Sequence, residues 1–283
     1  MAIHDSFARL TPYELLFPTE EEAERVCGEI LQEAEARSVD VGELSIFLSL
    51  APVGGWLRSL RPDDVGGEGI HRYALLAHQA VLFHRGGRRL FLAGEEMVRR
   101  VVGNLGEGPD AAGPGAGPEP ALPARAGYLQ LPRHLVWIHP VAGGPPEPVD
   151  GLFWNLHGDG TLRLLAALGV REGRPGLAVS PIAEAPWSEA GSWLAVRVRE
   201  AGPDFETRLP GGELEELYSL ETAGEALKLF AGIWTWGAPD PTGPKEPDAV
   251  PASDAPGPAA ASTLSDAPAP SRLPWTTVHP THT

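Results

Sequence analysis

Glycine and proline are concentrated in two stretches of this chain, and their distribution limits how it can fold. The chain has 34 Gly and 30 Pro among its 283 residues. One stretch is 104–126, which includes the run GPGAGP at 113–118, and the other is 237–283. Proline lacks a backbone N–H and glycine loses much conformational entropy on folding, so neither stretch favours a helix or strand. We therefore expect an α+β protein with domains at 1–103 and 127–236, a flexible linker between them and a disordered Pro/Ala-rich tail.

Residues 1–103 are predicted to be mostly helical. Thr19 and Glu22 have the spacing of a capping box, and apolar residues follow at helical intervals. Residues 70–83 are apolar at nearly every position apart from one narrow polar stripe, so this helix should form the buried centre of the domain. The stripe consists of His71, Arg72, His78 and Gln79. Further elements are expected at 41–50 (helix), 89–93 (strand) and 95–102 (helix).

Residues 127–236 change from helical spacing to the alternation that is typical of β-strands. Strands are expected at 128–131, 135–139, 152–156, 161–170, 177–182 and 193–199. The short connections between them predict an antiparallel sheet in which successive strands are neighbours. Thr222 and Glu225 form a second capping box, and apolar residues then recur through Trp234. The second domain should therefore be an antiparallel sheet covered by a C-terminal helix.

The chain carries a net charge of −16. Nucleic acids are bound by Lys and Arg that replace the counterions around phosphate, so no nucleic acid is expected as a partner. The same charge disfavours an anionic membrane surface. The most apolar stretch, 44–57, is interrupted by Pro52 and is too short to span a bilayer, so no membrane insertion is expected. The first residues lack the pattern of a signal peptide, and we expect a soluble, cytoplasmic protein.

No pattern in the sequence predicts a metal site or a bound cofactor. The single cysteine, Cys27, excludes an intrachain disulfide and a zinc site built from cysteines, and it faces the apolar side of its helix. His71, His78 and His84 are separated by seven and six residues, whereas metal ligation from one helix requires spacings of three or four. The glycines at 113–117 lack the preceding strand and following helix of a phosphate loop.

A candidate binding site in the second domain consists of Trp137, His139, Trp154, His157 and Asp159. A histidine here can act as a general base or a metal ligand, with an aspartate fixing its tautomer. The structural alternative is a tight hairpin, because the glycines on both sides of Asp159 suit a turn with two positive φ angles. In that case His157 only flanks the turn.

Six of the eight tryptophans lie between 127 and 236, at positions 137, 154, 187, 193, 234 and 236. At this density they fit a ligand pocket, a protein interface or a large aromatic core. Their positions on expected strands and on the covering helix favour the core.

The tail contains one segment with anchor residues, at 272–278. Arg272, Leu273 and Trp275 occur together there, and Trp275 is the only aromatic residue in 237–283. Nearby prolines favour an extended conformation, which lowers the entropy lost on docking. We expect the segment to contact a folded surface, either the second domain of this protein or a partner, with these three residues binding. The alternative is a disordered end without a motif.

Two hypotheses for the function follow, and the sequence does not decide whether the protein is an enzyme. The first is a non-enzymatic protein-interaction or scaffold subunit of a larger assembly, with a protein partner, because Gly/Pro-rich tethers and many tryptophans occur without a catalytic motif. The alternative is an enzyme or small-ligand-binding protein with a Trp/His-lined site on the second domain. A deep pocket favours the alternative, whereas a flat exposed apolar patch favours the interaction hypothesis.

Overall fold

The structure is a computed structural model that describes residues 8–59, 67–107, 120–132, 135–138, 147–168, 179–195, 206–208, 214–216, 218–220, 223–245 and 270–281. Within these ranges it contains helices and one large mixed sheet, so the α+β class expected from the sequence is confirmed. None of the described helices is both long and apolar enough to cross a membrane.

The N-terminal part of the described chain is helical, as the sequence predicts. Its helices are α1 Pro12–Leu16, α2 Glu20–Ala36, α3 Leu44–Ser49, α4 Ala51–Ser59 and α5 Gly67–Arg85. Thr19 caps α2 by accepting a hydrogen bond from the backbone N–H of Glu22 at 3.2 Å. Cys27 lies on the buried face of α2, and burial raises the pKa of its thiol to about 12. This cysteine therefore packs as a small apolar side chain.

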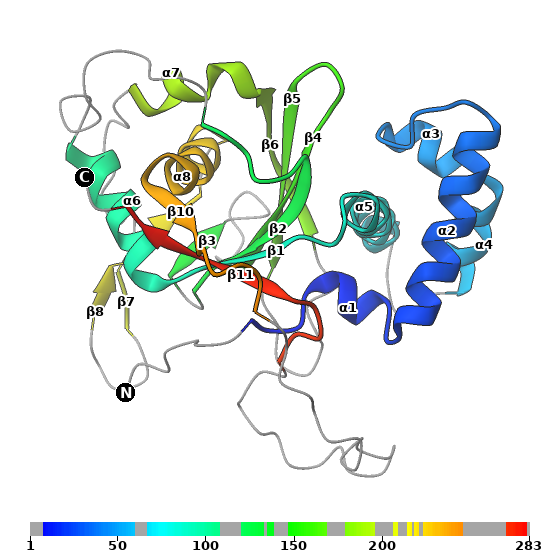
Figure 1. Cartoon of the computed structure of the whole chain (residues 1–283), viewed down its shortest axis with the longest axis horizontal. Coiled ribbons are helices and arrows are strands. Elements are labelled where there is room, and N and C mark those ends of the chain that lie inside the picture. Colours follow the sequence, from blue (N-terminus) through cyan, green and yellow to red (C-terminus); the bar gives the residue numbers. More distant parts are fainter. Residues whose placement is uncertain are drawn as a thin grey trace, which may run out of the picture.

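One sheet of nine strands runs through the centre of the molecule (Figure 1). Its strands are β1 Leu90–Ala93, β2 Ala126–Gln130, β3 Val136–Ile138, β4 Glu147–Leu156, β5 Thr161–Leu168, β6 Val179–Pro186, β9 Tyr218–Ser219, β10 Gly237–Pro239 and β11 Trp275–Pro280. Hydrogen bonding connects them in the order β10-β11-β1-β2-β4-β3-β9, and β4 also pairs with β5, which pairs with β6. A separate hairpin is formed by β7 Glu206–Arg208 and β8 Leu214–Glu216.

The sheet is mixed, which corrects the purely antiparallel sheet expected from the sequence. Strands β2, β4, β5 and β6 do form antiparallel pairs. However, β1 is parallel to both β2 and β11, and β3 is parallel to β9. Successive strands can be parallel only if a long connection returns the chain to the same end, and α6 Glu95–Glu107 lies in the connection between β1 and β2. The alternation within each strand does not reveal such a connection.

Strands from both predicted domains share this sheet. Strand β1 belongs to the predicted domain 1–103 and β2 to the predicted domain 127–236, and the two strands pair directly. Helix α5 also packs against β2, β4 and β6. Whether the two segments fold independently stays a prediction, and residues 108–119 of the predicted linker lie outside the described residues.

The tail supplies two strands of the sheet within its described residues, whereas disorder was expected for 237–283 apart from a possible docking segment at 272–278. Strand β10 pairs with β11, and β11 pairs with β1, so β11 is an inner strand. Leu273, Trp275 and Val278 are buried. Burial of these side chains and pairing with two strands offset the conformational entropy that the segment loses on ordering. Residues 246–269 lie outside the described part of the chain.

The strand expected at 193–199 is wrong for its first three residues, which lie in helix α7 Ala190–Ala195, and its last four are outside the described residues. Trp187, Ala190 and Leu194 all pack against the core. Their spacing of three and four residues is helical, and this packing favours a helix over the alternating pattern.

The sheet has a packed layer on each face, because side chains along a strand alternate between the faces. On one face, α8 Ala223–Trp236 and α6 cover a core that contains Trp154 and Trp234. On the other face, α5 covers a core that contains Tyr128 and Phe153, and α2, α3 and α4 pack outside α5 (Figure 1). The helix that was expected to lie across the sheet is α8.

Candidate ligand-binding site

A cavity of about 540 Å³ lies on the α5 face of the sheet, between α3, α5 and the strands β4, β5 and β6. Its volume is within the range of sites that bind small molecules, about 300–1,000 Å³. Much of its wall is apolar, and its polar lining residues are Glu43, Ser45, His78, Gln79, Asn155, His157, Arg163 and Glu184. An apolar wall with a small number of polar groups is typical of a ligand pocket.

His78 on α5 is a neutral histidine in this wall. Its Nε2 lies 2.8 Å from the backbone oxygen of Val41, and its ring packs against Phe47 with ring centres 4.9 Å apart. Because a carbonyl oxygen can only accept, the proton is on Nε2, and Nδ1 carries a lone pair. Within the described residues Nδ1 makes no hydrogen bond. Burial lowers the pKa of His78 to about 4, so the ring is neutral at pH 7.

Gln79, the next residue of α5, is tied to the sheet by one side of its amide. Its Nε2 donates to the backbone oxygen of Trp154 at 3.5 Å, which is a long hydrogen bond. This contact orients the amide, because the opposite orientation places two oxygens against each other. Oε1 has no hydrogen-bond partner among the described residues, although Gln79 is buried.

Asn155 and His157 come from the end of β4 and share one face, because residues two apart on a strand point the same way. Nδ2 of Asn155 lies 3.1 Å from Nε2 of His157. With the amide in this orientation Nδ2 donates and Nε2 accepts, so the imidazole proton is on Nδ1. Oε1 of Glu43 is 3.9 Å from this Nδ1. Burial, followed by the positive charge of Arg163, lowers the pKa of His157 and favours the neutral ring.

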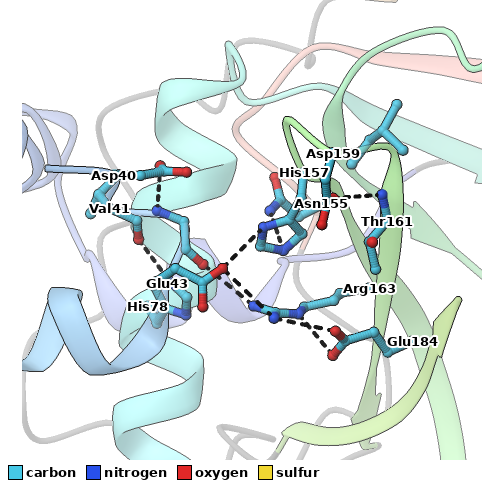
Figure 2. Close-up of polar contacts among 12 residues, drawn as sticks. Asp40, Val41, Glu43, His78, Asn155, His157, Asp159, Thr161, Arg163 and Glu184 are labelled. Carbon is cyan, nitrogen blue, oxygen red and sulfur yellow. Dashed lines mark hydrogen bonds and ion pairs between the residues drawn. The ribbon is translucent and has the colours of Figure 1, made fainter. Parts of the chain in front are cut away.

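A charged rim formed by Glu43, Arg163 and Glu184 borders the cavity (Figure 2). Arg163 on β5 is opposite Glu184 on β6, and its guanidinium makes two hydrogen bonds to the carboxylate, at 2.8 and 3.3 Å. Glu43, in the loop before α3, lies between His157 and Arg163, with Oε1 3.9 Å from a nitrogen of each. The side chains of this rim thus come both from the loop before α3 and from the sheet.

Hydrogen bonds hold the loop that carries Glu43. Asp40 accepts from the backbone N–H of Gly42 at 2.8 Å, and this bond lowers the pKa of the Asp40 carboxyl. The backbone oxygen of Val41 lies 2.8 Å from Nε2 of His78, and the backbone oxygen of Gly42 accepts a hydrogen bond from the guanidinium of Arg163 at 3.5 Å. Side chains from α5 and β5 thus fix the position of the loop relative to the cavity.

Three polar side chains of the wall each keep one acceptor unpaired within the described structure: Nδ1 of His78, Oε1 of Gln79 and Oδ1 of Asn155. These residues are 6, 2 and 3 % exposed. In the described part of the chain, the only fully enclosed side-chain polar atoms without a partner are the indole nitrogens of Trp234 and Trp275. The three acceptors therefore reach open space, and the cavity is the space that their side chains line. Unpaired polar atoms in a nearly buried wall indicate a site that another molecule can complete.

Of the five residues predicted to form a site in the second domain, His157 is the one that the structure places in the cavity wall. Trp154 is fully buried on the opposite face of the sheet, because residues three apart on a strand point to opposite sides. Its indole N–H donates to the carbonyl of Ala124 at 3.0 Å. Trp137 on β3 is partly buried and does not line the cavity. His139 lies outside the described residues.

Asp159 belongs to the hairpin between β4 and β5, in agreement with the structural alternative. The backbone N–H of Gly160 donates to the carbonyl of His157 at 3.1 Å, and Oδ1 of Asp159 accepts from the N–H of Thr161 at 2.9 Å. In this turn only Gly160 has a positive φ angle, +85°, which corrects the two positive angles expected. Asp159 is exposed and lies beside Thr161, away from Glu43 and Arg163 (Figure 2). It therefore does not orient the imidazole by a hydrogen bond.

Arg272, Leu273 and Trp275 are used in contacts within the chain. Arg272 donates to three backbone carbonyls in 14–18, around the end of α1. Leu273 and Trp275 are buried in the core on the α5 face of the sheet. None of the three lines the cavity, so the structure does not bring them together with His157.

Sequence reasoning does not identify Gln79, Asn155, Glu43 or Arg163 as site residues. One signal was present: His78 and Gln79 are polar positions in an apolar helix, and Asn155 interrupts an apolar strand. Polar residues are rarely buried unless they are paired or functional. The packing of α5 on the sheet, which local spacing does not predict, decides that these residues meet.

Among the described residues, no group of three or more histidine, cysteine, aspartate or glutamate side chains is arranged to hold a metal ion. Comparison with models of protein families, with curated proteins and with solved structures found no match for this chain. The geometry of the cavity is therefore the basis for a functional proposal.

Proposed function

We propose that the protein binds a small polar molecule in the cavity between α3, α5 and the strands β4 to β6. This is the ligand-binding alternative of the two hypotheses, with a site that contains His157 but no tryptophan. One observation supports it: His78, Gln79 and Asn155 are nearly buried, and each has an unpaired acceptor in the cavity wall. These acceptors are open to the cavity, and a hydrogen bond contributes about 0.5–1.5 kcal/mol net, so each one that a ligand donor pairs with can add to the binding free energy.

The interaction or scaffold hypothesis has less support. Among the described residues, Leu48 is the only large hydrophobic side chain that is exposed, so no broad apolar patch marks a partner surface there. Trp275, the expected anchor for a partner, is buried next to β1 of the same chain. The aromatic core accounts for Trp154 and Trp234.

Binding of a panel of small polar fragments to the full chain tests the proposal. Ligand-observed NMR detects weak binding, and the melting temperature gives an independent readout. Ser45 on α3 lines the cavity and is exposed, and Ser45→Leu fills part of the cavity with a larger side chain. Ala36→Leu, at the exposed end of α2, is the matched control because it adds the same side chain far from the cavity wall.

We expect to find fragments that bind the wild type and Ala36→Leu equally well. These fragments should bind Ser45→Leu at least about tenfold more weakly, because the added side chain occupies the site. Far-UV circular dichroism of both variants checks that the fold is retained. The proposal fails if no fragment binds the wild type, or if the fragments bind the folded Ser45→Leu variant equally well.

A further inference from the structure

We infer that the ligand of this cavity is a small organic amine, bound as an ammonium ion with an apolar body against the leucine-rich wall. This inference rests on the proposed function and names the class of molecule that the site recognises. Three properties of the lining support it: the type of its unpaired polar atoms, its charge, and its apolar area.

Most of the unpaired polar atoms of the buried wall are acceptors, and the N–H at Nδ1 of His157, 3.9 Å from Glu43, is an unpaired donor. His78 uses its N–H on the loop before α3, Gln79 uses its amide nitrogen on Trp154, and Asn155 uses its amide nitrogen on His157. Each of the three side chains thus uses one N–H on the protein and presents an acceptor to the cavity, and the two amide nitrogens each keep a second N–H. A primary ammonium group has three donors and no acceptor, whereas a carboxylate or phosphate ligand brings more acceptors. A ligand whose polar group donates can therefore pair with all three acceptors.

The charge of the lining also favours a cation. Its charged members are Arg163, Glu43 and Glu184, and Arg163 is paired with Glu184 through two hydrogen bonds. Among the described residues, the ionisable nitrogens nearest to Oε1 of Glu43 are Nδ1 of His157 and a guanidinium nitrogen of Arg163. Each is 3.9 Å away, which is too far for a hydrogen bond. The neutral rings of His78 and His157 add no positive charge. The carboxylate of Glu43 is therefore available to pair with a ligand cation at the rim.

The remaining lining suits an apolar body. It consists of Leu44, Leu75, Leu82, Leu164, Leu165, Pro181, Ile182, Ala183 and Ala223. Covering such side chains is favourable only for a molecule that itself has apolar surface, such as an aryl or alkyl group. An amine attached to such a group matches both parts of the wall, whereas an inorganic cation matches neither the size nor the apolar area of the cavity.

Three probes that differ only in their end group test this inference. Phenethylamine, phenethyl alcohol and phenylpropionate share a phenyl ring and a short chain, and they end in an ammonium, a hydroxyl and a carboxylate. Their affinities for the full chain are measured by calorimetry and ligand-observed NMR at pH 7. We expect the amine to bind at least about tenfold more tightly than the alcohol, because hydrogen bonds to an ionised group are the stronger ones. We expect no measurable binding of the carboxylate.

Glu43→Gln separates the charge of the rim from its shape. Glu43 is exposed, so the substitution leaves the fold intact, and the amide has almost the same volume as the carboxylate. We expect affinity for phenethylamine to fall about tenfold and affinity for phenethyl alcohol to stay unchanged, because only the amine carries a charge. Glu35→Gln, at an exposed position of α2, is the matched control and should change neither affinity.

The outcomes separate this inference from the proposed function. Binding of the alcohol or the carboxylate as tightly as the amine overturns the amine assignment, while the cavity still binds a small molecule. Amine binding that is insensitive to Glu43→Gln also overturns it. Failure of all three probes overturns the inference, and the fragment panel with Ser45→Leu then decides the proposed function independently.

Discussion

The two faces of the sheet are built from the same strands but are filled differently. On the α8 face, Trp154 is fully buried, and its ring centre lies between 5.5 and 5.8 Å from those of Phe91, Phe230 and Trp234. On the α5 face, the next residue of β4, Asn155, borders a cavity of about 540 Å³. One step along the strand thus separates a close-packed aromatic core from a hollow with a partly polar wall.

This difference shows how one sheet can combine stability and a binding site. Close packing on the α8 face gives favourable burial of aromatic area. On the α5 face, three polar side chains keep an acceptor that is open to the cavity, which adds no hydrogen bond to the fold but is available to a ligand. Substitutions on the α8 face should therefore change mainly stability, and substitutions in the cavity wall should change mainly binding.

Trp154→Ala should have the largest effect, a loss of about 3–5 kcal/mol in the free energy of unfolding, because it empties a large and fully enclosed site. Asn155→Ala, one residue further on the cavity face, should cost about 1 kcal/mol, because it removes one hydrogen bond beside open space. Urea unfolding followed by circular dichroism measures both. Equal losses for the two variants would mean that the faces are packed alike.

His78 should make the stability of the α5 face depend on pH. Its pKa in the folded protein is about 4, below the ordinary 6.5, so the unfolded chain binds the proton more readily. The contribution to stability is complete above pH 6.5 and is lost as the pH falls from 6.5 to about 4. The total is about 3 kcal/mol.

His78→Gln should therefore reduce the loss of stability on acidification, measured by urea unfolding at pH 7 and pH 4.5. The pKa values of His84 and His157 are also lowered, chiefly by burial, so the variant keeps part of the pH dependence. Superimposable pH profiles for wild type and variant would show that His78 is not held neutral by burial.

Glu14 lies on the same side of the sheet as α5, and both oxygens of its carboxylate accept hydrogen bonds. It differs in this from the three polar side chains of the cavity wall that each keep an unpaired acceptor. Its carboxylate accepts hydrogen bonds from Thr11, from the hydroxyl of Ser271 and from the backbone N–H of Arg272. Glu14→Gln should cost about 2 kcal/mol, because an amide hydrogen replaces an acceptor among these donors. Glu35→Gln on exposed α2 should stay within about 0.5 kcal/mol in the same urea titration. A loss below that limit for Glu14→Gln would mean that the contacts with the tail contribute little.

Gln79→Met should have the smallest effect on stability, within about 1 kcal/mol, because it replaces an amide that has one long hydrogen bond and one unpaired oxygen. The volume of the side chain is nearly unchanged. The same variant should weaken binding of phenethylamine about fivefold, because Oε1 of Gln79 is lost as an acceptor in the cavity wall. A cost above about 2 kcal/mol in urea unfolding would indicate that the amide is fully paired, which contradicts the contrast between the two faces.

Features that depend on residues a few positions apart could be predicted from the sequence. Thr19 caps α2, the apolar run at 70–83 lies in α5, and Gly160 closes the hairpin after β4. Each follows from spacing within one or two turns of chain, where propensity and capping act. Of the residues that line the cavity, His157 could be named as a candidate from the sequence, whereas Asn155, two residues before it, could not.

The sequence by itself determined which positions of α5 and β4 are polar within apolar elements, and it determined the helical and strand segments around them. Only the tertiary structure decided that these positions face each other across one cavity, as the contact between Gln79 and Trp154 across 75 positions illustrates. It also decided that β11 of the tail pairs in parallel with β1. The physical reason is that burial of apolar area, which drives both associations, is non-directional and leaves no local spacing from which a distant partner can be predicted.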